Sequence, residues 1–329
     1  MGIRYLNKYL KENATKSIKI ANLSDLSGKK IAIDISIYMY KYASEDTLIE
    51  NIYLMLTVFR YYNIIPIFIF DGKPPVEKKE LLQKRREEKK EAQEEYNILK
   101  KQIELNNIHE NDKQEIIQNM DLLKKKFVSI SKYDIENVKK LIRAYGATYF
   151  DAHGEADELC ALLTIKEKVW ACLSEDMDMF LYGCPRVIRY LSLLNHTVVL
   201  YDLKGILTEL QLNQTQLREI CILSGTDYNI KVENDDNKKS NNLYTTLKYF
   251  NKYKKENQSE SFYDWLLSNT SYIENINLLK SINKIFDLSK NYNNLQIFEN
   301  IKIINGLIDK IKIKEILKKD GFYFMCNLN

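Results

Sequence analysis

The chain lacks several features that define other protein classes. Its 329 residues include three histidines and five cysteines, and no cysteine pair has Cys-x-x-Cys spacing. These shortages argue against a zinc site, and the odd number of cysteines favours reduced thiols over a disulfide framework. No apolar run approaches the roughly 20 residues of a membrane span, and no signal peptide begins the chain. We therefore expect an intracellular globular protein of the nucleus or cytoplasm, with no membrane partner.

Neither sign of charge dominates the composition. Lysine and arginine total 49 against 45 aspartates and glutamates, which gives a formal net charge of +4 and a pI near 8.5. This weak basicity is compatible with a nucleic-acid partner but does not establish one. The length suffices for one large α/β domain, or for one domain with an appendage.

Glycine is absent from two long stretches. The first lies between Gly72 and Gly146, and its residues 76–101 are dominated by strong helix formers that follow two prolines. We predict two charged helices over residues 76–130 that are interrupted near 106–112 and project from the rest of the protein. Their charge alone favours a solvated surface hairpin.

The second glycine-free stretch lies between Gly225 and Gly306. It contains residues 229–242, which are rich in asparagine, lysine and aspartate, as is typical of a polar loop. The isoleucines of the tail recur at helical spacing at Ile297, Ile301, Ile304, Ile308 and Ile311. We therefore predict that residues 229–329 form a mostly helical C-terminal region with a loop at 229–242.

The rest of the chain alternates short apolar runs with helical patterns. Strand-like runs are found at residues 29–33, 64–70, 147–150, 169–173, 186–191 and 197–202, and helical patterns at 36–62, 134–145, 155–166 and 217–223. A helix between two parallel strands forms a right-handed βαβ unit. We predict an α/β fold in which helices flank a central, mostly parallel sheet.

Seven acidic residues lie at or beyond the ends of these predicted elements: Asp34, Asp71, Glu155, Asp157, Asp176, Asp178 and Asp227. Ligands of open α/β sheets bind outside the carboxyl ends of the strands, so we expect these side chains to converge on one cleft. One such aspartate is commonly a helix N-cap, but seven are not explained in this way. Bound cations would neutralise them, and carboxylate oxygens select Mg²⁺ or Mn²⁺.

Six sequence blocks resemble those of the flap endonucleases, which belong to the XPG superfamily of structure-specific 5′ nucleases. They are Met1-Gly2-Ile3, Ile33-Asp34-Ile35-Ser36, Phe70-Asp71-Gly72-Lys73-Pro74-Pro75, Glu155-Ala156-Asp157, Glu175-Asp176-Met177-Asp178 and Gly225-Thr226-Asp227-Tyr228. The third and fifth blocks together are highly specific. The resemblance covers roughly residues 1–228. It implies a PIN-like 5′-nuclease core in which residues 76–130 form a helical arch over the active site.

The resemblance also implies a phosphodiesterase that uses two Mg²⁺ ions, which Mn²⁺ can replace. By motif position, one ion is held by Asp71, Glu155 and Asp157, the other by Asp176, Asp178 and Asp227, and Asp34 assists through bound water. At position 157 the family more often has glutamate, so the shorter aspartate shifts this ligand or interposes a water. Lys78 and Arg85, seven residues apart and so on one helix face, match the basic residues that reach the scissile phosphate.

Further residues match DNA contacts of the family. Tyr40 matches an aromatic that stacks on a base, although a core tyrosine is an equally good interpretation. Arg189 matches a second phosphate-directed arginine, and a structural role is equally compatible with its sequence. The expected partner is branched or 5′-flapped DNA, bound by a monomer.

The chain departs from the family after Asp227. Members of the family have a glycine-containing helix–turn–helix there, which grips duplex DNA through backbone amides and a bound K⁺. Because this stretch has no glycine, we expect duplex affinity to come from Lys231, Lys238 and Lys239. No sliding-clamp motif is evident, since Phe322-Tyr323-Phe324 lacks the preceding glutamine, and we expect this segment to pack on the protein.

The leading hypothesis is therefore a Mg²⁺-dependent, structure-specific DNA nuclease that acts at 5′ flaps or ends in replication, repair or recombination. A 5′→3′ exonuclease or a junction-cutting relative is an alternative within the same superfamily. An alternative of another class is a catalytically weak DNA-binding scaffold. Seven mutually repelling carboxylates without metal ions would destabilise such a scaffold, which argues against it.

Overall fold

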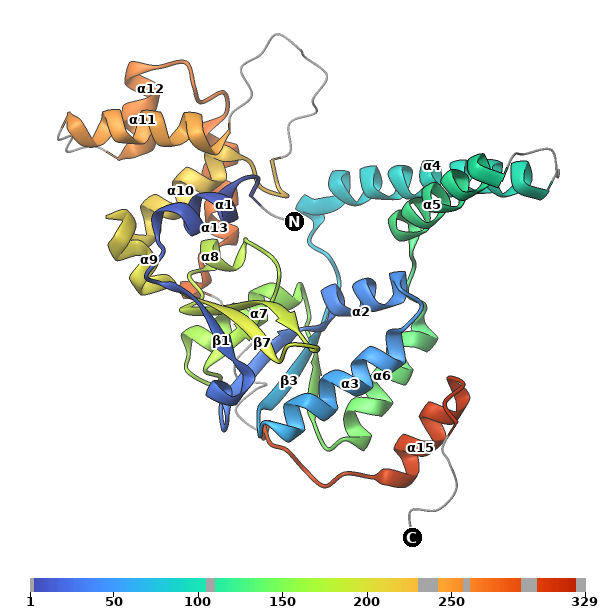
Figure 1. Ribbon diagram of the computed structural model, residues 1–329. Coiled ribbons are helices and arrows are strands. Elements are labelled where there is room, and N and C mark those ends of the chain that lie inside the picture. Colours follow the sequence, from blue (N-terminus) through green and yellow to red (C-terminus); the bar gives the residue numbers. More distant parts are fainter. Residues whose placement is uncertain (1–2, 105–109, 230–241, 257–260, 291–300, 324–329) are drawn as a thin grey trace.

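A seven-stranded sheet lies at the centre of the protein in the computed structural model, which describes residues 3–104, 110–229, 242–256, 261–290 and 301–323 (Figure 1). The strand order is β1-β7-β6-β5-β2-β3-β4. The strands are β1 (Ile18–Asn22), β2 (Lys30–Asp34), β3 (Ile65–Phe70), β4 (Thr148–Asp151), β5 (Ala171–Leu173), β6 (Arg186–Ser192) and β7 (Thr197–Asp202). The neighbours from β6 to β4 pair in parallel, and β7 is antiparallel to both β6 and β1. The predicted mostly parallel sheet is confirmed.

Helices cover both faces of this sheet because its strands bury side chains alternately on the two sides. Ile31 and Ile33 of β2 pack into one buried cluster and Ala32 into the other. The first cluster includes residues of α2 (Ile35–Ser44), α3 (Leu48–Tyr61), α6 (Lys132–Ala144) and α15 (Lys310–Lys319). The second includes residues of α1 (Leu6–Asn13), α7 (Ala156–Ile165), α8 (Met179–Tyr182), α9 (Leu203–Leu210) and α10 (Gln214–Ser224).

One predicted helix is two helices in the structure. The pattern at residues 36–62 predicts a single helix, but α2 ends at Ser44 and α3 begins at Leu48. Asp46, between them, has a left-handed φ of 55°, and the backbone N–H of Thr47 turns back to the carbonyl of Tyr42. The apolar periodicity runs through this break because both helices bury residues in the same cluster.

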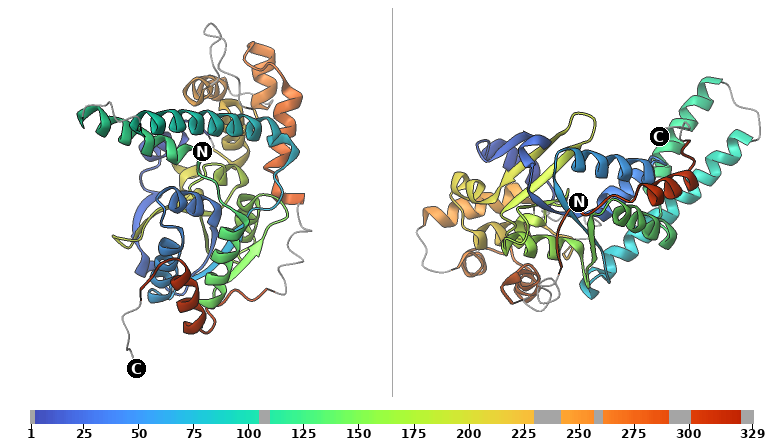
Figure 2. Two further views of the ribbon diagram at one scale, coloured as in Figure 1. Left: turned by 90° about the vertical axis from the view of Figure 1, so that its right-hand side faces the viewer. Right: turned by 90° about the horizontal axis from the view of Figure 1, so that it is seen from below.

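The charged segment after β3 forms a helical hairpin that extends away from the sheet in every view (Figure 2). After a short 3₁₀ turn (Val76–Lys78) come α4 (Lys79–Glu104) and α5 (Glu110–Phe127). The two helices pack through Tyr96 and Phe127, whose ring centroids are 5.3 Å apart. We call this hairpin the arch.

The C-terminal region contains α11 (Leu243–Lys255), α12 (Phe262–Asn269), α13 (Ile276–Ile285) and the 3₁₀ turn Leu288–Lys290. The helix predicted from the isoleucines at 301, 304 and 308 is wrong, because residues 301–309 have no helical hydrogen bonds. Gly306 N donates to Gly146 O at 2.8 Å, Arg60 Nη2 donates to Gly306 O, and the Asn305 side chain donates to Ile64 O. These partners, distant in sequence, replace the helix. Ile297 lies outside the described residues.

After this segment the chain forms α15, which packs against α6 (Figure 1). Ile313 and Leu317 are its buried residues, and the ring of Phe322 lies 6.3 Å from that of Tyr53. Phe322 therefore packs as expected, whereas Tyr323 is fully exposed and residue 324 lies outside the described part of the chain. Among the described residues, no helix is both long and apolar enough to cross a membrane.

Candidate metal and nucleic-acid site

The sheet topology places the acidic residues at one edge. Asp34 is the last residue of β2, Asp71 follows β3 directly, and Asp176 lies just after β5. Because β5, β2 and β3 are adjacent and parallel, their carboxyl ends meet. The N-terminal turn of α7 adds Glu155 and Asp157 to the same edge.

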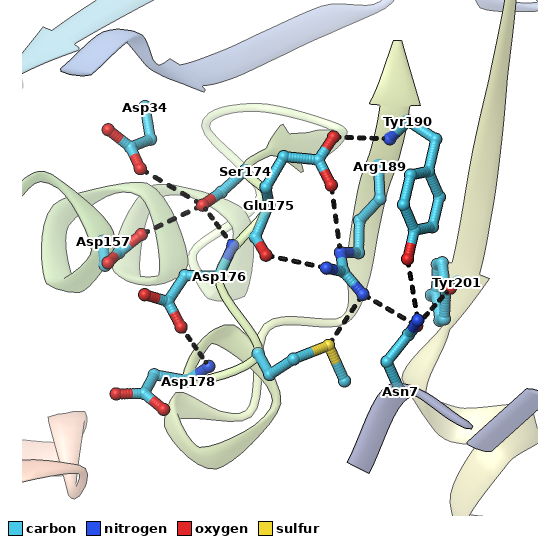
Figure 3. A network of polar contacts seen from close by, with 11 residues as sticks. Asn7, Asp34, Asp157, Ser174, Glu175, Asp176, Asp178, Arg189, Tyr190 and Tyr201 are labelled. Atoms are coloured by element: carbon cyan, nitrogen blue, oxygen red, sulfur yellow. Dashed lines mark hydrogen bonds and ion pairs between the residues drawn. The ribbon is translucent and has the colours of Figure 1, made fainter. Parts of the chain in front are cut away.

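Ser174 connects two of these carboxylates with the backbone of a third acidic residue (Figure 3). Its hydroxyl oxygen lies 3.2 Å from both Asp34 Oδ2 and Asp157 Oδ1, and it accepts a hydrogen bond from Asp176 N at 3.2 Å. Asp178 N in turn donates to Asp176 Oδ1 at 3.0 Å. The backbone from Ser174 to Asp178 thus orients its own acidic side chains. Sequence analysis missed Ser174, although it directly precedes the Glu175-Asp176-Met177-Asp178 block.

The Asp71 side of the site depends on a glycine. Gly72 N donates to Gly154 O at 2.8 Å, which brings the β3 turn against residues 152–154. A Cβ at position 72 would lie 2.0 Å from Ala152 O, so only glycine permits this approach. Asp71 Oδ1 then accepts a hydrogen bond from Ala156 N at 2.8 Å, at the first turn of α7. This contact fixes Asp71 beside Glu155 and Asp157.

The two predicted phosphate-binding cations lie in the site and pair with its acids. Lys78 Nζ is 2.7 Å from Glu155 Oε1, and Arg85 Nη2 is 2.9 Å from Asp227 Oδ2. Tyr228, which sequence analysis missed, donates its hydroxyl to Glu155 Oε2 at 2.9 Å. The only signal for it was its place in the Gly225-Thr226-Asp227-Tyr228 block. The seven predicted metal ligands and these two cations therefore belong to one connected region.

Burial and mutual repulsion raise the pKa values of three of the carboxylates. Burial, together with the carboxylates of Asp71 and Asp176, raises the pKa of Asp34 to about 8. Burial and neighbouring acids also raise the pKa of Asp157 and of Asp178 well above the ordinary range. Burial by itself lowers the pKa of Lys78, but Glu155 and the other nearby acids outweigh it and raise this pKa. The site therefore favours added positive charge.

The donor set fits a hard divalent cation. Its oxygens are carboxylates, and Asp178 Oδ1 is buried without a hydrogen-bond partner among the described residues. Even so, no three His, Cys, Asp or Glu side chains in the described ranges are arranged to hold a metal ion in the geometry of the structure. Glu155 and Asp227 each have one carboxylate oxygen engaged by Lys78 or Arg85.

The predicted DNA contacts have different outcomes. Tyr40 on α2 is 47% exposed, with Lys89 Nζ 5.1 Å from its ring centre, so it is not a core tyrosine. Arg189 is buried, and its guanidinium contacts Asn7, Glu175 and Met177 rather than open surface (Figure 3). Lys231, Lys238 and Lys239 lie outside the described residues.

Comparison with known families identifies this arrangement. The model of the XPG N-terminal domain matches residues 1–92, and that of the XPG I-region matches residues 146–227. The chain belongs to the XPG family. The two matches contain all seven acidic residues and both cations, and the predicted resemblance is confirmed.

Relatives in the XPG family include Flap endonuclease 1 of Zea mays, which is 33% identical over 247 residues. This match covers 69% of the chain but 62% of the relative's length. Among solved structures, the catalytic core of Rad2 in complex with DNA substrate has a TM-score of 0.64 at 20% identity and covers 98% of this chain and 95% of its own. Flap endonuclease-1 from Methanococcus jannaschii has a TM-score of 0.61 at 24% identity, with 92% and 90% covered. The predicted 5′-nuclease fold is confirmed.

Proposed function

We propose that this chain is a Mg²⁺-dependent, structure-specific nuclease that hydrolyses DNA phosphodiester bonds at 5′ flaps or 5′ ends. The observation that carries the proposal is one sheet edge that combines seven acidic residues with two cations of the arch segment. The name of the plant relatives, Flap endonuclease 1, supports this substrate class. We expect the protein to act as a monomer in replication, repair or recombination, in the nucleus or cytoplasm.

Two groups of carboxylates would hold the two ions. Asp71, Glu155 and Asp157 would hold one, Asp176, Asp178 and Asp227 the other, with Asp34 acting through water. Two such ions supply an activated water and stabilise the leaving oxygen of a phosphodiester. Asp178 Oδ1 is buried and has no hydrogen-bond partner among the described residues, which supports its assignment as a ligand.

Lys78 and Arg85 would bind the phosphate next to the cut. Each now contacts a carboxylate that is assigned to a metal ion. With a divalent cation bound, the carboxylates would hold the two side chains less strongly, and a DNA phosphate would be their better partner. Arg85 can bind phosphate through two N–H groups, whereas Lys78 contributes a point charge.

The arch would guide the unpaired strand toward this site. A cavity of about 500 Å³ at its base is lined by Arg86, Lys89, Lys90 and Lys124, among other residues. Tyr40 lies beside Lys89 and would stack on a base of the same strand. Lys231, Lys238 and Lys239 would bind the duplex. In this proposal residues 1–228 form the nuclease core with its arch at 76–130, and residues 229–329 form the C-terminal region.

A matched substrate panel tests the proposal. The substrates are a 5′ flap, a nick, a gap, a single strand and a four-way junction, each with Mg²⁺ and with EDTA. Preferred, Mg²⁺-dependent cleavage of the 5′ flap is expected. Preference for ends or for the junction would favour the exonuclease or junction-cutting alternative. Binding of all substrates without cleavage in Mg²⁺ or Mn²⁺ would favour the scaffold.

A further inference from the structure

Strand β6 contains a bulge directly beside the candidate metal site. Arg189 pairs with Val199 of β7, and the next recorded pair joins Ser192 to Thr197, so β6 has one extra residue between these points. Tyr190 within the bulge has a left-handed φ of 55°, which is strained for a bulky residue. Bulges near functional sites re-aim side chains and free backbone groups from the sheet.

The bulge aims two groups at Glu175. The freed Tyr190 N donates to Glu175 Oε1 at 2.6 Å, and Arg189 Nε lies 3.5 Å from Glu175 Oε2. Arg189 Nη2 also donates to the backbone carbonyl of Glu175 at 2.8 Å. Both the side chain and the main chain of Glu175 are therefore held, and this residue directly precedes Asp176.

The same guanidinium contacts Met177, the residue after Asp176, and Asn7 of the N-terminal helix α1. Arg189 Nη1 lies 2.7 Å from Met177 Sδ and donates to Asn7 Oδ1 of α1 at 2.8 Å. Asn7 is fixed in turn, because its Nδ2 donates to the Tyr190 hydroxyl at 2.7 Å. Arg189 is 6% exposed, so these contacts lie inside the protein (Figure 3).

We propose that Arg189 is a positioning residue for the metal centre. With Asn7 and Glu175, it holds the backbone from Glu175 to Met177 so that Asp176 and Asp178 face the same cation. Arg189 then acts through the protein and does not contact a DNA phosphate. This inference rests on the metal centre of the proposed function.

The test titrates Mn²⁺ into the full chain without DNA and measures the free Mn²⁺ by electron paramagnetic resonance. Arg189→Gln should weaken Mn²⁺ binding about 10-fold, the lower end of the effect typical for groups that orient metal ligands. Its affinity for flap DNA in EDTA should stay within about twofold of wild type, since Arg189 is not at the DNA surface. The matched control is Arg186→Gln on the same strand, which should leave both affinities unchanged.

Three results would overturn the inference. Unchanged Mn²⁺ affinity in a folded Arg189→Gln variant would show that the arginine serves stability alone, even if Tm falls. Lower DNA affinity with unchanged Mn²⁺ affinity would show a phosphate contact. If Arg189→Gln does not fold, the variant Glu175→Gln tests the inference instead. It keeps the arginine but removes the negative charge that Arg189 and Tyr190 N contact. Unchanged Mn²⁺ affinity in this variant would again exclude a positioning role. A wild-type chain that binds no Mn²⁺ would instead refute the metal centre of the proposed function.

Discussion

Single residues at the carboxyl edge of the sheet differ in what holds them. Asp71 is fixed by the Ala156 N–H, and Asp34 and Asp157 approach the Ser174 hydroxyl. Asp178 Oδ1 has no such partner among the described residues. Asp34, Asp71 and Asp157 are thus oriented by neutral groups, which leave their charge uncompensated, whereas Glu155 and Asp227 pair with Lys78 and Arg85.

At this scale we predict that Asp176→Asn and Asp71→Asn each abolish cleavage while the fold is retained. Loss of one metal ligand removes several kcal/mol of transition-state stabilisation, and about 4 kcal/mol corresponds to roughly a thousandfold in rate. Single-turnover cleavage of a 5′ flap in saturating Mg²⁺ measures the effect, and circular dichroism checks the fold. Glu94→Gln on the exposed arch is the control. Turnover near that of wild type in either variant would refute the site assignment.

At the scale of elements, the arch segment contributes charges to the site as well as a projecting hairpin. Its first residues supply Lys78 and Arg85, which reach Glu155 and Asp227. Farther along α4, Lys90 and Lys101 are exposed, and Lys90 lies 3.6 Å from Glu94 of the same helix. The cations at the start of the arch segment therefore pair with acids of the site, whereas these two lysines farther along α4 are exposed.

We predict that Lys78→Ala and Arg85→Ala each lower the single-turnover rate roughly 100-fold, with a much smaller effect on DNA affinity. The reason is that both charges are aimed at negative charge that develops in the transition state. Rapid-quench kinetics and equilibrium binding separate the two effects. Lys101→Ala, at an exposed position farther along α4, should change neither by more than about twofold. Equal losses at all three positions would leave only a general basic surface.

The segment between α10 and α11 gives a second prediction at this scale. If side-chain lysines replace a backbone K⁺ site, duplex affinity should fall with total salt and should not depend on which monovalent cation is present. Duplex binding in KCl, NaCl and LiCl at one concentration measures this. A clear advantage in KCl would show that the asparagine-rich segment forms an ion site, contrary to our expectation for residues 229–242.

For the whole molecule, the acidic edge opposes folding unless added positive charge compensates it. Strands β2, β3 and β5 and helix α7 all converge there, so repulsion among the carboxylates acts on the centre of the fold. The pKa of Asp34 is raised from 3.8 to about 8. Between these values the folded state binds more protons than the unfolded state, so its stability falls as pH rises through this window.

We therefore predict that, in EDTA, Tm falls between pH 5 and pH 8, and that Mg²⁺ raises it more at pH 8. A ligand at 100 times its Kd stabilises a protein by about 2.7 kcal/mol, and protons compete for the same oxygens at lower pH. Thermal unfolding with EDTA or Mg²⁺ at both pH values measures the effect. Asp34→Asn should reduce the dependence on pH. An equal response to Mg²⁺ at both values would contradict the raised pKa.

Sequence alone determined the core strands and the acidic site. The buried parallel strands form continuous apolar runs, and the acids follow them directly, so local order in the chain already places Asp34, Asp71 and Asp176 at one edge. Lys78 and Arg85 were predicted from the resemblance to the flap endonucleases, with their seven-residue spacing as support, and the structure places Lys78 in the 3₁₀ turn before α4. The arch helices were predictable from their composition.

Tertiary structure decided what depends on distant partners. The isoleucines at 301–308 have helical spacing, yet Gly146, Arg60 and Thr148 take backbone groups that a helix needs. The break at Asp46 cannot be predicted from the apolar pattern of the sequence, because α2 and α3 bury residues in the same cluster. The position of Arg189 depends on a bulge and on Asn7, which lies 182 residues away in the chain. Such contacts form only when the chain is folded, and the local pattern of residues does not predict them.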